Sequence, residues 1–403
     1  MTLEPPLVLV DATTLRTSGG RRGLGRMGFD LLHGLAETRD EWASQLAIHV
    51  VTHFDFRRGW MISSDLATAA DTSLAARNTV KGELPLLRRT LLGHAARATG
   101  AHLLHLIDPD GTPLFCRIPL VTTCHDLVPL RFAKRYLGPT PLHRYKRWLI
   151  DRRRYGRPAR VIAISQRTCD DLIDLLQVPR SQIDVVSNGV DLGRWRAGDP
   201  NNDRERRRRL GVGTTPYVFF AGHCDYKKNV RGMIEALKLA RRRIDLHLVL
   251  AGDMPSAMIE GVRARARKEG VGDAVKLLGY VDDADLPALY RGASALLFLS
   301  HLEGFGLPVA EAMAAGCPVI VPRGSGSDEV GGNAAVLVEA GDSAAAADAM
   351  ERLVIDPIER QRYLALGQVR AEAFDRRTMA RGYVASYCRA LARLERACKF
   401  EDP

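Results

Sequence analysis

Two glutamates with seven residues between them, Glu303 and Glu311, are the strongest chemical signal in the sequence. Gly304-Phe305-Gly306 follows the first glutamate, and Leu307-Pro308 suits the first turn of a helix. Glycines let a backbone approach a bound sugar closely, and the amide groups at a helix start attract a diphosphate. We therefore interpret Glu303 as facing a sugar and Glu311 as facing a nucleotide ribose. An ordinary helix start with a favourable acid in its first turn would show the same pattern.

Two adjacent lysines, Lys227 and Lys228, follow a strand-like run at 217–221 and precede a helical stretch. At the end of a strand, paired cations could neutralise the charge of a departing diphosphate. A solvated turn is the competing interpretation, and for an isolated pair of lysines it is the more common one.

The first half of the chain offers two weaker signals. Gly23 and Gly25 belong to a Gly-Leu-Gly-Arg segment that we expect to form a loop after the opening strand, where a phosphate or an acceptor could bind. His125 follows the predicted strand 120–123 and could orient a sugar hydroxyl. Short glycine loops and single histidines are also common structural features, so only their positions after strands favour a function.

Asp108-Pro109-Asp110 matches a pattern in which two carboxylates hold a divalent cation against a diphosphate. The same residues, followed by glycine, are strong turn formers. We therefore predict a turn here, and we expect neither a metal site nor a cofactor.

The candidate residues come just after predicted strands. Short runs rich in Val, Ile and Leu alternate with helical patterns, which predicts an α/β fold with parallel sheets covered by helices on both faces. In such folds, ligands bind beyond the carboxyl ends of the strands. The pattern restarts near residue 213, so we predict domains at 1–205 and 206–375, with a final helix at about 376–400.

Composition and charge argue against several classes of protein. The 403 residues are 46% hydrophobic and 26% charged, which is typical of a globular protein. The seven cysteines form no CxxC pair, the N-terminus lacks the features of a secretion signal, and no apolar run could cross a bilayer. We expect a soluble, cytoplasmic protein. The net charge is +11, but no nucleic-acid-binding motif accompanies it, so nucleic acid is not an expected partner.

Most of the excess positive charge lies in residues 131–160, where eleven Lys and Arg residues face a single acid, Asp151. Apolar side chains recur in this segment near helical spacing: Leu142, Tyr145, Trp148, Leu149 and Tyr155. The pattern suits a helix lying on an anionic membrane surface, with the protein peripheral to the inner face of the membrane. It equally suits a helix packed on its own domain with a charged outer face.

Taken together, these segments resemble the retaining glycosyltransferases of family 4. That family has the GT-B fold, in which two Rossmann-like domains present parallel sheets to an interdomain cleft. EGFGLPVAE at 303–311, continued by AMAAGCPV, is similar to the family's glutamate–seven–glutamate motif. GLGR at 23–26, HDLVP at 125–129 and NGVD at 188–191 resemble motifs of its first domain. The family's last helix returns to the first domain, which would account for residues 376–400.

The resemblance implies a role for each candidate. Glu303 and His125 would lie near the reacting carbon of the donor sugar, while Glu311 would bind the ribose. Lys228 would bind the diphosphate. The implied catalytic residues are Glu303, His125 and Lys228, and the implied donor-binding residues are Gly23, Gly25, Lys227, Lys228, Glu303, Gly304, Phe305, Gly306, Leu307 and Glu311.

The implied reaction moves a hexose from a nucleoside-diphosphate sugar to an acceptor hydroxyl with retention of configuration and without a metal. The resemblance favours GDP-mannose, UDP-glucose or UDP-N-acetylglucosamine as donor, with a weak preference for GDP-mannose, and a lipid-linked or growing bacterial surface glycan as acceptor. A GT-B phosphorylase, a sugar-nucleotide epimerase and an inactive nucleotide-binding scaffold are the alternatives. The chain departs from the family at Lys227, where arginine is common, and at His223, where some members have arginine. Lysine at 227 replaces a bidentate fork by a point charge, and a neutral imidazole at 223 would weaken the compensation of phosphate charge.

Overall fold

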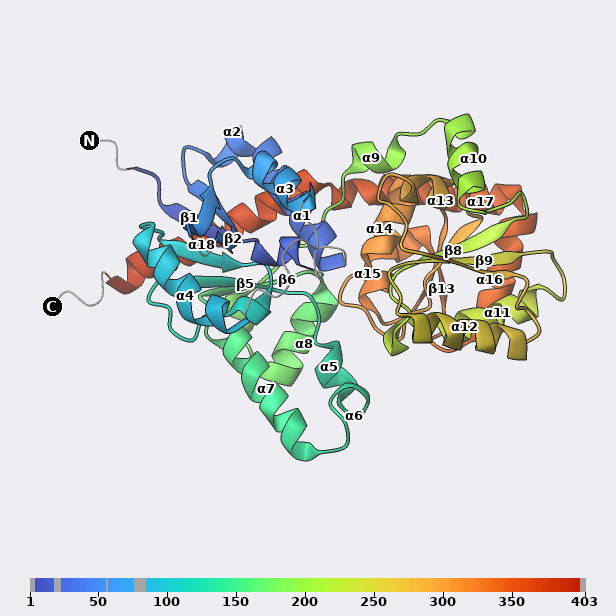
Figure 1. The fold of residues 1–403 in the computed structure, drawn as a ribbon, viewed down its shortest axis with the longest axis horizontal. Helices are drawn as coiled ribbons and strands as arrows, with labels where there is room; N and C mark the ends of the chain where they lie inside the picture. Colours follow the sequence, from blue (N-terminus) through green and yellow to red (C-terminus); the bar gives the residue numbers. More distant parts are fainter. Residues whose placement is uncertain (1–3, 18–22, 56, 76–84, 399–403) are drawn as a thin grey trace. The chain divides into compact units, whose positions relative to one another are not determined.

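The computed structural model describes residues 4–17, 23–55, 57–75 and 85–398. The chain divides into two compact units, the first made of Met1–Gly189 with Arg376–Pro403 and the second of Val190–Asp375. Each unit contains one sheet with helices packed around it (Figure 1). Within the described ranges, no helix is both long and apolar enough to cross a membrane.

The first unit has a seven-stranded sheet in the order β3-β2-β1-β4-β5-β6-β7. Its strands are β1 (Leu7–Asp11), β2 (Ala47–Asp55), β3 (Gly59–Ser63), β4 (Leu103–Leu106), β5 (Leu120–Cys124), β6 (Arg160–Ala163) and β7 (Ile183–Val185). Neighbouring strands run parallel except β3, which pairs antiparallel with β2 at the edge. The predicted parallel sheet is confirmed, and β3 adds one antiparallel strand at its edge.

The helices of the first unit include the last one in the chain. They are α1 (Gly23–Glu37), α2 (Arg39–Trp42), α3 (Leu66–Ala75), α4 (Pro85–Ala98), α5 (Val128–Arg131), α6 (Ala133–Tyr136), α7 (Pro141–Gly156), α8 (Gln166–Leu176) and α18 (Arg376–Cys398). Helix α1 packs against α3 and α18, and Tyr383, Tyr387 and Ala390 of α18 belong to the apolar core beneath β1 and β2. The final helix is thus a part of this core.

A buried polar chain also joins α18 to the strands of the first unit. Nδ1 of His105 in β4 lies 2.9 Å from the Tyr387 hydroxyl, and its Nε2 lies 2.9 Å from Oγ1 of Thr123 in β5. The Tyr383 hydroxyl lies 3.2 Å from the same Thr123 oxygen. Burial lowers the pKa of His105 to about 3, so its ring is neutral and can donate with one nitrogen and accept with the other.

The second unit has a six-stranded parallel sheet in the order β10-β9-β8-β11-β12-β13. Its strands are β8 (Tyr217–Ala221), β9 (His247–Ala251), β10 (Val275–Gly279), β11 (Ala295–Leu297), β12 (Val319–Pro322) and β13 (Ala335–Val338). The chain moves outward from β8 to β9 and β10, then crosses to β11 on the other side. The strand order therefore reverses between β8 and β11, and a crevice at such a reversal is the usual ligand site of a doubly wound sheet.

The helices of the second unit begin before its first strand. They are α9 (Leu192–Arg196), α10 (Pro200–Arg209), α11 (Val230–Ala240), α12 (Ser256–Lys268), α13 (Leu286–Gly292), α14 (Leu307–Ala314), α15 (Gly326–Gly331), α16 (Ser343–Ile355) and α17 (Pro357–Ala371). The predicted boundary at 205/206 cuts through α10, whereas the chain divides between Gly189 and Val190. Helix α10 is packed on this unit, because Arg291 of α13 pairs with Asp203 of α10 at 2.6 Å.

Candidate functional site

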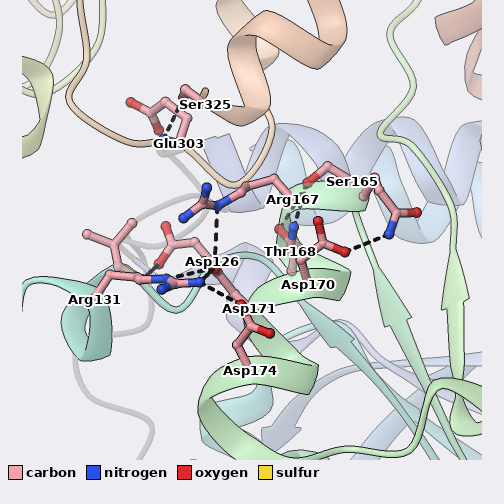
Figure 2. A network of polar contacts seen from close by, with 12 residues as sticks. Asp126, Arg131, Ser165, Arg167, Thr168, Asp170, Asp171, Asp174, Glu303 and Ser325 are labelled. Atoms are coloured by element: carbon pink, nitrogen blue, oxygen red, sulfur yellow. Dashed lines mark hydrogen bonds and ion pairs between the residues drawn. The ribbon is translucent and has the colours of Figure 1, made fainter. Parts of the chain in front are cut away.

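The loop after β11 holds Glu303 in a defined conformation. The Glu303 amide donates to Oγ of Ser325 at 3.0 Å, and the Gly326 amide donates to the Glu303 carbonyl at 3.0 Å. Figure 2 shows the hydrogen bond between Glu303 and Ser325. Two main-chain anchors on one residue fix the direction of its side chain. Sequence reasoning did not single out Ser325, which lies 22 residues downstream.

The loop turns into α14 at Gly306. This residue has φ of 105°, in the left-handed region that favours glycine, and a Cβ on it would lie 3.0 Å from Cβ of Ser327. Residues 304–307 are buried, and the ring of Phe305 packs edge-on against Phe374 with centroids 5.6 Å apart. Pro308 occupies the first turn of α14, as expected. The sequence prediction of a glycine-rich entry into a helix is confirmed.

The segment after β8 is tied to the loop after β11. Lys227 and Lys228 form a short 3-10 turn, and the Lys227 carbonyl accepts from the His301 amide at 2.7 Å. Asn229 has φ of 52° and caps α11 by accepting from the Gly232 amide at 3.1 Å, while its Nδ2 donates to the Leu299 carbonyl at 3.1 Å. These bonds hold both lysines at the carboxyl end of β8.

Glu303 lies between the two lysines. Its Oε1 is 2.6 Å from Nζ of Lys228, and its Oε2 is 3.6 Å from Nζ of Lys227. Only 6% of Glu303 is exposed, and burial alone would raise its pKa. The positive charges of Lys228 and Lys227 outweigh the burial and hold the pKa of this carboxyl below its usual range. The three side chains therefore carry one net positive charge at neutral pH.

Glu311, the second glutamate of the pair, has a hydrogen-bond partner outside this cluster. It is completely buried in α14, and its Oε2 accepts from the Tyr290 hydroxyl at 2.9 Å. The Tyr290 ring meets Trp195 and Phe219 edge-on, with centroids 5.4 and 5.0 Å away. Because Glu311 is fully buried here, the ribose contact stays a prediction.

In the first unit, His125 follows β5 as expected. Its Nε2 lies 2.7 Å from the Ile107 carbonyl at the end of β4, so the ring spans two neighbouring strand ends. Burial lowers the pKa of His125, although the hydrogen bond to Ile107 and the charges of Asp108 and Asp126 oppose this. The ring is therefore neutral, and its Nε2–H is directed at the carbonyl oxygen.

The residue after His125, Asp126, lies beside a group of ion pairs around α8. Figure 2 shows Asp126 beside Arg131, close to the first turn of α8. Arg131 contacts Asp171 at 2.7 Å and Asp174 at 3.2 Å, and Ser165 caps α8 by accepting from the Thr168 amide at 3.0 Å. These contacts fix the loop that carries His125 on the side facing α8.

Gly23 and Gly25 do not form the predicted loop. Helix α1 begins at Gly23, so both glycines lie in its first turn. Leu24 and Met27 pack on the apolar core, which extends the helical pattern further toward the N-terminus than the glycines suggested. A helix start can also bind an anion, so a phosphate or acceptor site at these glycines stays a prediction.

The predicted turn at Asp108-Pro109-Asp110 is confirmed. Asp108 accepts from the Asp110 amide at 3.0 Å, and Asp110 pairs with Arg154. Across the ranges that the structure covers, no three His, Cys, Asp or Glu side chains are grouped so that they could hold a metal ion.

Two doubly wound units of this kind define the GT-B class, and comparisons with known proteins identify the family. Residues 201–367 match the family model described as Glycosyl transferases group 1, and residues 72–194 match Glycosyltransferase Family 4. A D-inositol 3-phosphate glycosyltransferase of Frankia alni is 31% identical over 293 residues, which cover 68% of this chain and 69% of that protein. The chain belongs to the family of group 1 glycosyl transferases.

Two further similarities show how far the match extends. A D-inositol 3-phosphate glycosyltransferase of Salinispora arenicola is 32% identical over 260 residues, but these span only 56% of its length and 59% of this chain. The crystal structure of Anabaena HepE in complex with UDP-glucose has a TM-score of 0.72 and 19% identity, covering 95% of this chain and 99% of that chain. At this identity the likeness shows the shared fold.

Proposed function

We propose that the protein transfers a hexose from a nucleoside-diphosphate sugar to an acceptor hydroxyl with retention of configuration. The observation that carries the proposal is the cluster of Glu303, Lys227 and Lys228 at the reversal point between β8 and β11. Two cations beside one buried carboxylate suit a ligand that brings both hydroxyl groups and negative charge. A sugar joined to a diphosphate has this chemistry.

In the proposed reaction, contacts with the donor replace the ion pairs within the cluster. The sugar hydroxyls donate to Glu303, while Lys227 and Lys228 turn to the diphosphate. The bond between the anomeric carbon and the diphosphate oxygen breaks, and a bond to the acceptor oxygen forms on the same face. The acceptor proton passes to the departing diphosphate. The lysines and the amide groups at the start of α14 stabilise the leaving charge, so we propose a reaction that needs no metal.

Variants of the cluster test this proposal. Glu303→Gln and Lys228→Met should lower the rate of transfer from a sugar nucleotide by at least a hundredfold, as is typical when a group that stabilises transition-state charge is lost. Lys238→Met is the matched control, because Lys238 pairs with Glu269 elsewhere in the unit. Wild-type transfer by both folded site variants would refute the proposal.

The stereochemistry and the reaction type need separate measurements. The anomeric configuration of the product, read by NMR, should match that of the donor. Products from free phosphate and a glycoside would instead indicate a phosphorylase, and conversion of the donor sugar without an acceptor would indicate an epimerase. Nucleotide binding without any turnover would favour the scaffold alternative.

We propose UDP-glucose as the first donor to test, ahead of GDP-mannose and UDP-N-acetylglucosamine. HepE, which shares the fold, was solved with UDP-glucose. A sugar nucleotide that binds the folded protein raises its melting temperature, so a thermal-shift screen ranks the three donors directly. A stabilisation by GDP-mannose alone would reverse this order.

We further propose that α7 places the protein on an anionic membrane, which would bring it to a lipid-linked acceptor. The apolar stripe expected on this helix divides in two. Trp148 donates to the Leu175 carbonyl at 3.0 Å and Tyr155 is buried, so this part packs on its own unit. Leu142, Tyr145 and Leu149 are 54%, 57% and 45% exposed.

The exposed part of α7 combines apolar side chains with cations, which is the composition of helices that bind anionic lipids. We expect sedimentation with phosphatidylglycerol vesicles at low salt, and loss of binding in the Leu142→Gln/Tyr145→Gln variant. Ile358→Gln is the control, because Ile358 is 81% exposed in α17. Equal sedimentation of all three proteins would exclude α7 as the membrane contact.

A further inference from the structure

Arg16 occupies the edge of the first sheet where ligands of α/β folds bind. It ends a 3-10 turn, η1 (Thr13–Arg16), that follows β1 directly. The Ala12 amide donates to the Val51 carbonyl at 2.9 Å, so the chain after β1 stays beside β2, and His53 lies two residues further along β2. Arg16 and His53 therefore meet beyond the paired part of these strands, at their carboxyl ends.

Arg16 is a partly buried cation beside a neutral ring. Its Nη1 lies 2.5 Å from Nδ1 of His53. A guanidinium is a donor in all its contacts, so Nδ1 must accept and the ring proton must lie on Nε2. Burial and the neighbouring Arg16 both lower the pKa of His53, which keeps the ring neutral, although Asp55 opposes them. Nε of Arg16 is buried and has no hydrogen-bond partner among the described residues.

Three other arginines of the same unit pair with carboxylates, whereas the partly buried Arg153 donates to the carbonyls of Pro113 and Leu114. The ion pairs are Arg131 with Asp171 at 2.7 Å, Arg154 with Asp151 at 3.1 Å and Arg160 with Asp184 at 2.8 Å. Among the residues that the structure describes, no carboxylate pairs with Arg16. The nearby Asp11 accepts from the amide and hydroxyl of Thr13, and Asp55 accepts from the amides of Arg57 and Arg58.

A partly buried guanidinium without an anion carries a desolvation cost. A ligand that supplies the missing anion would remove that cost. Arginine suits this role because its planar fork binds two oxygens of a carboxylate or a phosphate at once. The donor cluster lies in the second unit, whereas Arg16 belongs to the first.

We propose that Arg16 and His53 form a binding site for an anionic group, a phosphate monoester or a carboxylate, carried by the acceptor. The assignment to the acceptor rests on the proposed transfer function. The proposed anion-binding site does not rest on the transfer function, because it can be tested with inorganic phosphate in the absence of donor and turnover. Failure of phosphate binding and failure of transfer are therefore separate results.

The test follows the ring resonances of His53 in the full-length, histidine-labelled protein, assigned with His53→Gln. Inorganic phosphate should shift these resonances, and it should raise the pKa of His53 because it offsets the charge of Arg16. Arg16→Met should weaken phosphate binding about tenfold or more, the usual loss for a charge-assisted hydrogen bond. Arg16→Lys keeps the charge but not the fork, and should bind with intermediate affinity.

Arg58→Met is the matched control, because Arg58 is an exposed arginine in the adjacent β2–β3 connection. It should bind phosphate like the wild type. Two results would overturn the site: no phosphate-dependent shift of His53 in the wild type, or equal binding by Arg16→Met and Arg58→Met. Acetate in place of phosphate shows whether a carboxylate is also accepted. Displacement of phosphate by UDP or GDP would assign the site to the donor diphosphate and overturn the acceptor assignment.

Discussion

Replacing Lys228 by methionine should destabilise the second unit by about 3 kcal/mol. Removal of one partner from a buried ion pair typically costs about 3–5 kcal/mol, because the other charge stays buried without compensation. Here Glu303 is 6% exposed, and Lys227 remains at 3.6 Å as a second cation, so the lower end of the range applies. Lys228 also lies 4.9 Å from the centre of the Phe298 ring, a contact worth about 0.5–1 kcal/mol that methionine replaces in part.

Urea unfolding of the full chain measures this change if the probe reports on the second unit alone. Trp195 is the only one of the four tryptophans within 190–375, and it is buried against Tyr290, so its indole resonance is such a probe. The double variant Lys228→Met/Glu303→Gln should recover most of the lost stability, because the buried side chain at position 303 then carries no charge. A loss below about 0.5 kcal/mol in Lys228→Met, or a double variant no more stable than the single one, would refute the reasoning.

Three other predictions concern the same unit. Because the pKa of Glu303 is held below its usual range, the stabilisation from its ion pairs is complete above about pH 4.5 and is lost as the pH falls through the lowered pKa; acid unfolding of Glu303→Gln, followed by circular dichroism, should lack this component. Tyr290→Phe removes the hydrogen bond to the buried Glu311 and should cost about 1.5–3 kcal/mol by urea unfolding, while Tyr290→Phe/Glu311→Gln should cost less. Asn229→Ala should cost about 2 kcal/mol, since it loses a helix cap and strains a positive φ, whereas Asn229→Gly should cost clearly less by the same measurement.

Much of the fold was predictable because the buried strands are recognisable from short stretches of sequence. The runs at β5 and β8 are rich in β-branched or aromatic residues, and β9 is rich in leucine and valine, so their type and position follow from short windows. Strand β3 was missed because Gly59–Ser63 pairs only at the sheet edge and contains a glycine. The boundary was misplaced because the arginine-rich α10 looks like a linker, although Arg206 bonds to Asp285, the N-cap residue of α13, at 2.6 Å.

The candidate site was predictable in part, because its residues follow strands that short stretches of sequence reveal. Sequence reasoning placed Glu303 and Lys228 after strands, but their contact across 75 residues depends on β8 and β11 being neighbours, which only the strand order shows. The burial of Glu311 was not predictable, because an acid near a helix start is usually exposed and its partner Tyr290 lies in another helix. The contact of Arg16 with His53 likewise joins a turn to a strand 37 residues away.

The placement of α18 has a consequence for how the protein is made. The second unit is an insertion whose two ends meet: Val190 and Asp375 form a parallel bridge, and the Val190 amide donates to the Phe374 carbonyl at 2.7 Å. On the ribosome, the whole of this insertion emerges before Tyr383 and Tyr387, which the first unit needs for its core. The first unit therefore cannot complete its core until α18 has been synthesised. Until then part of its apolar surface stays uncovered, while the second unit already has time to fold.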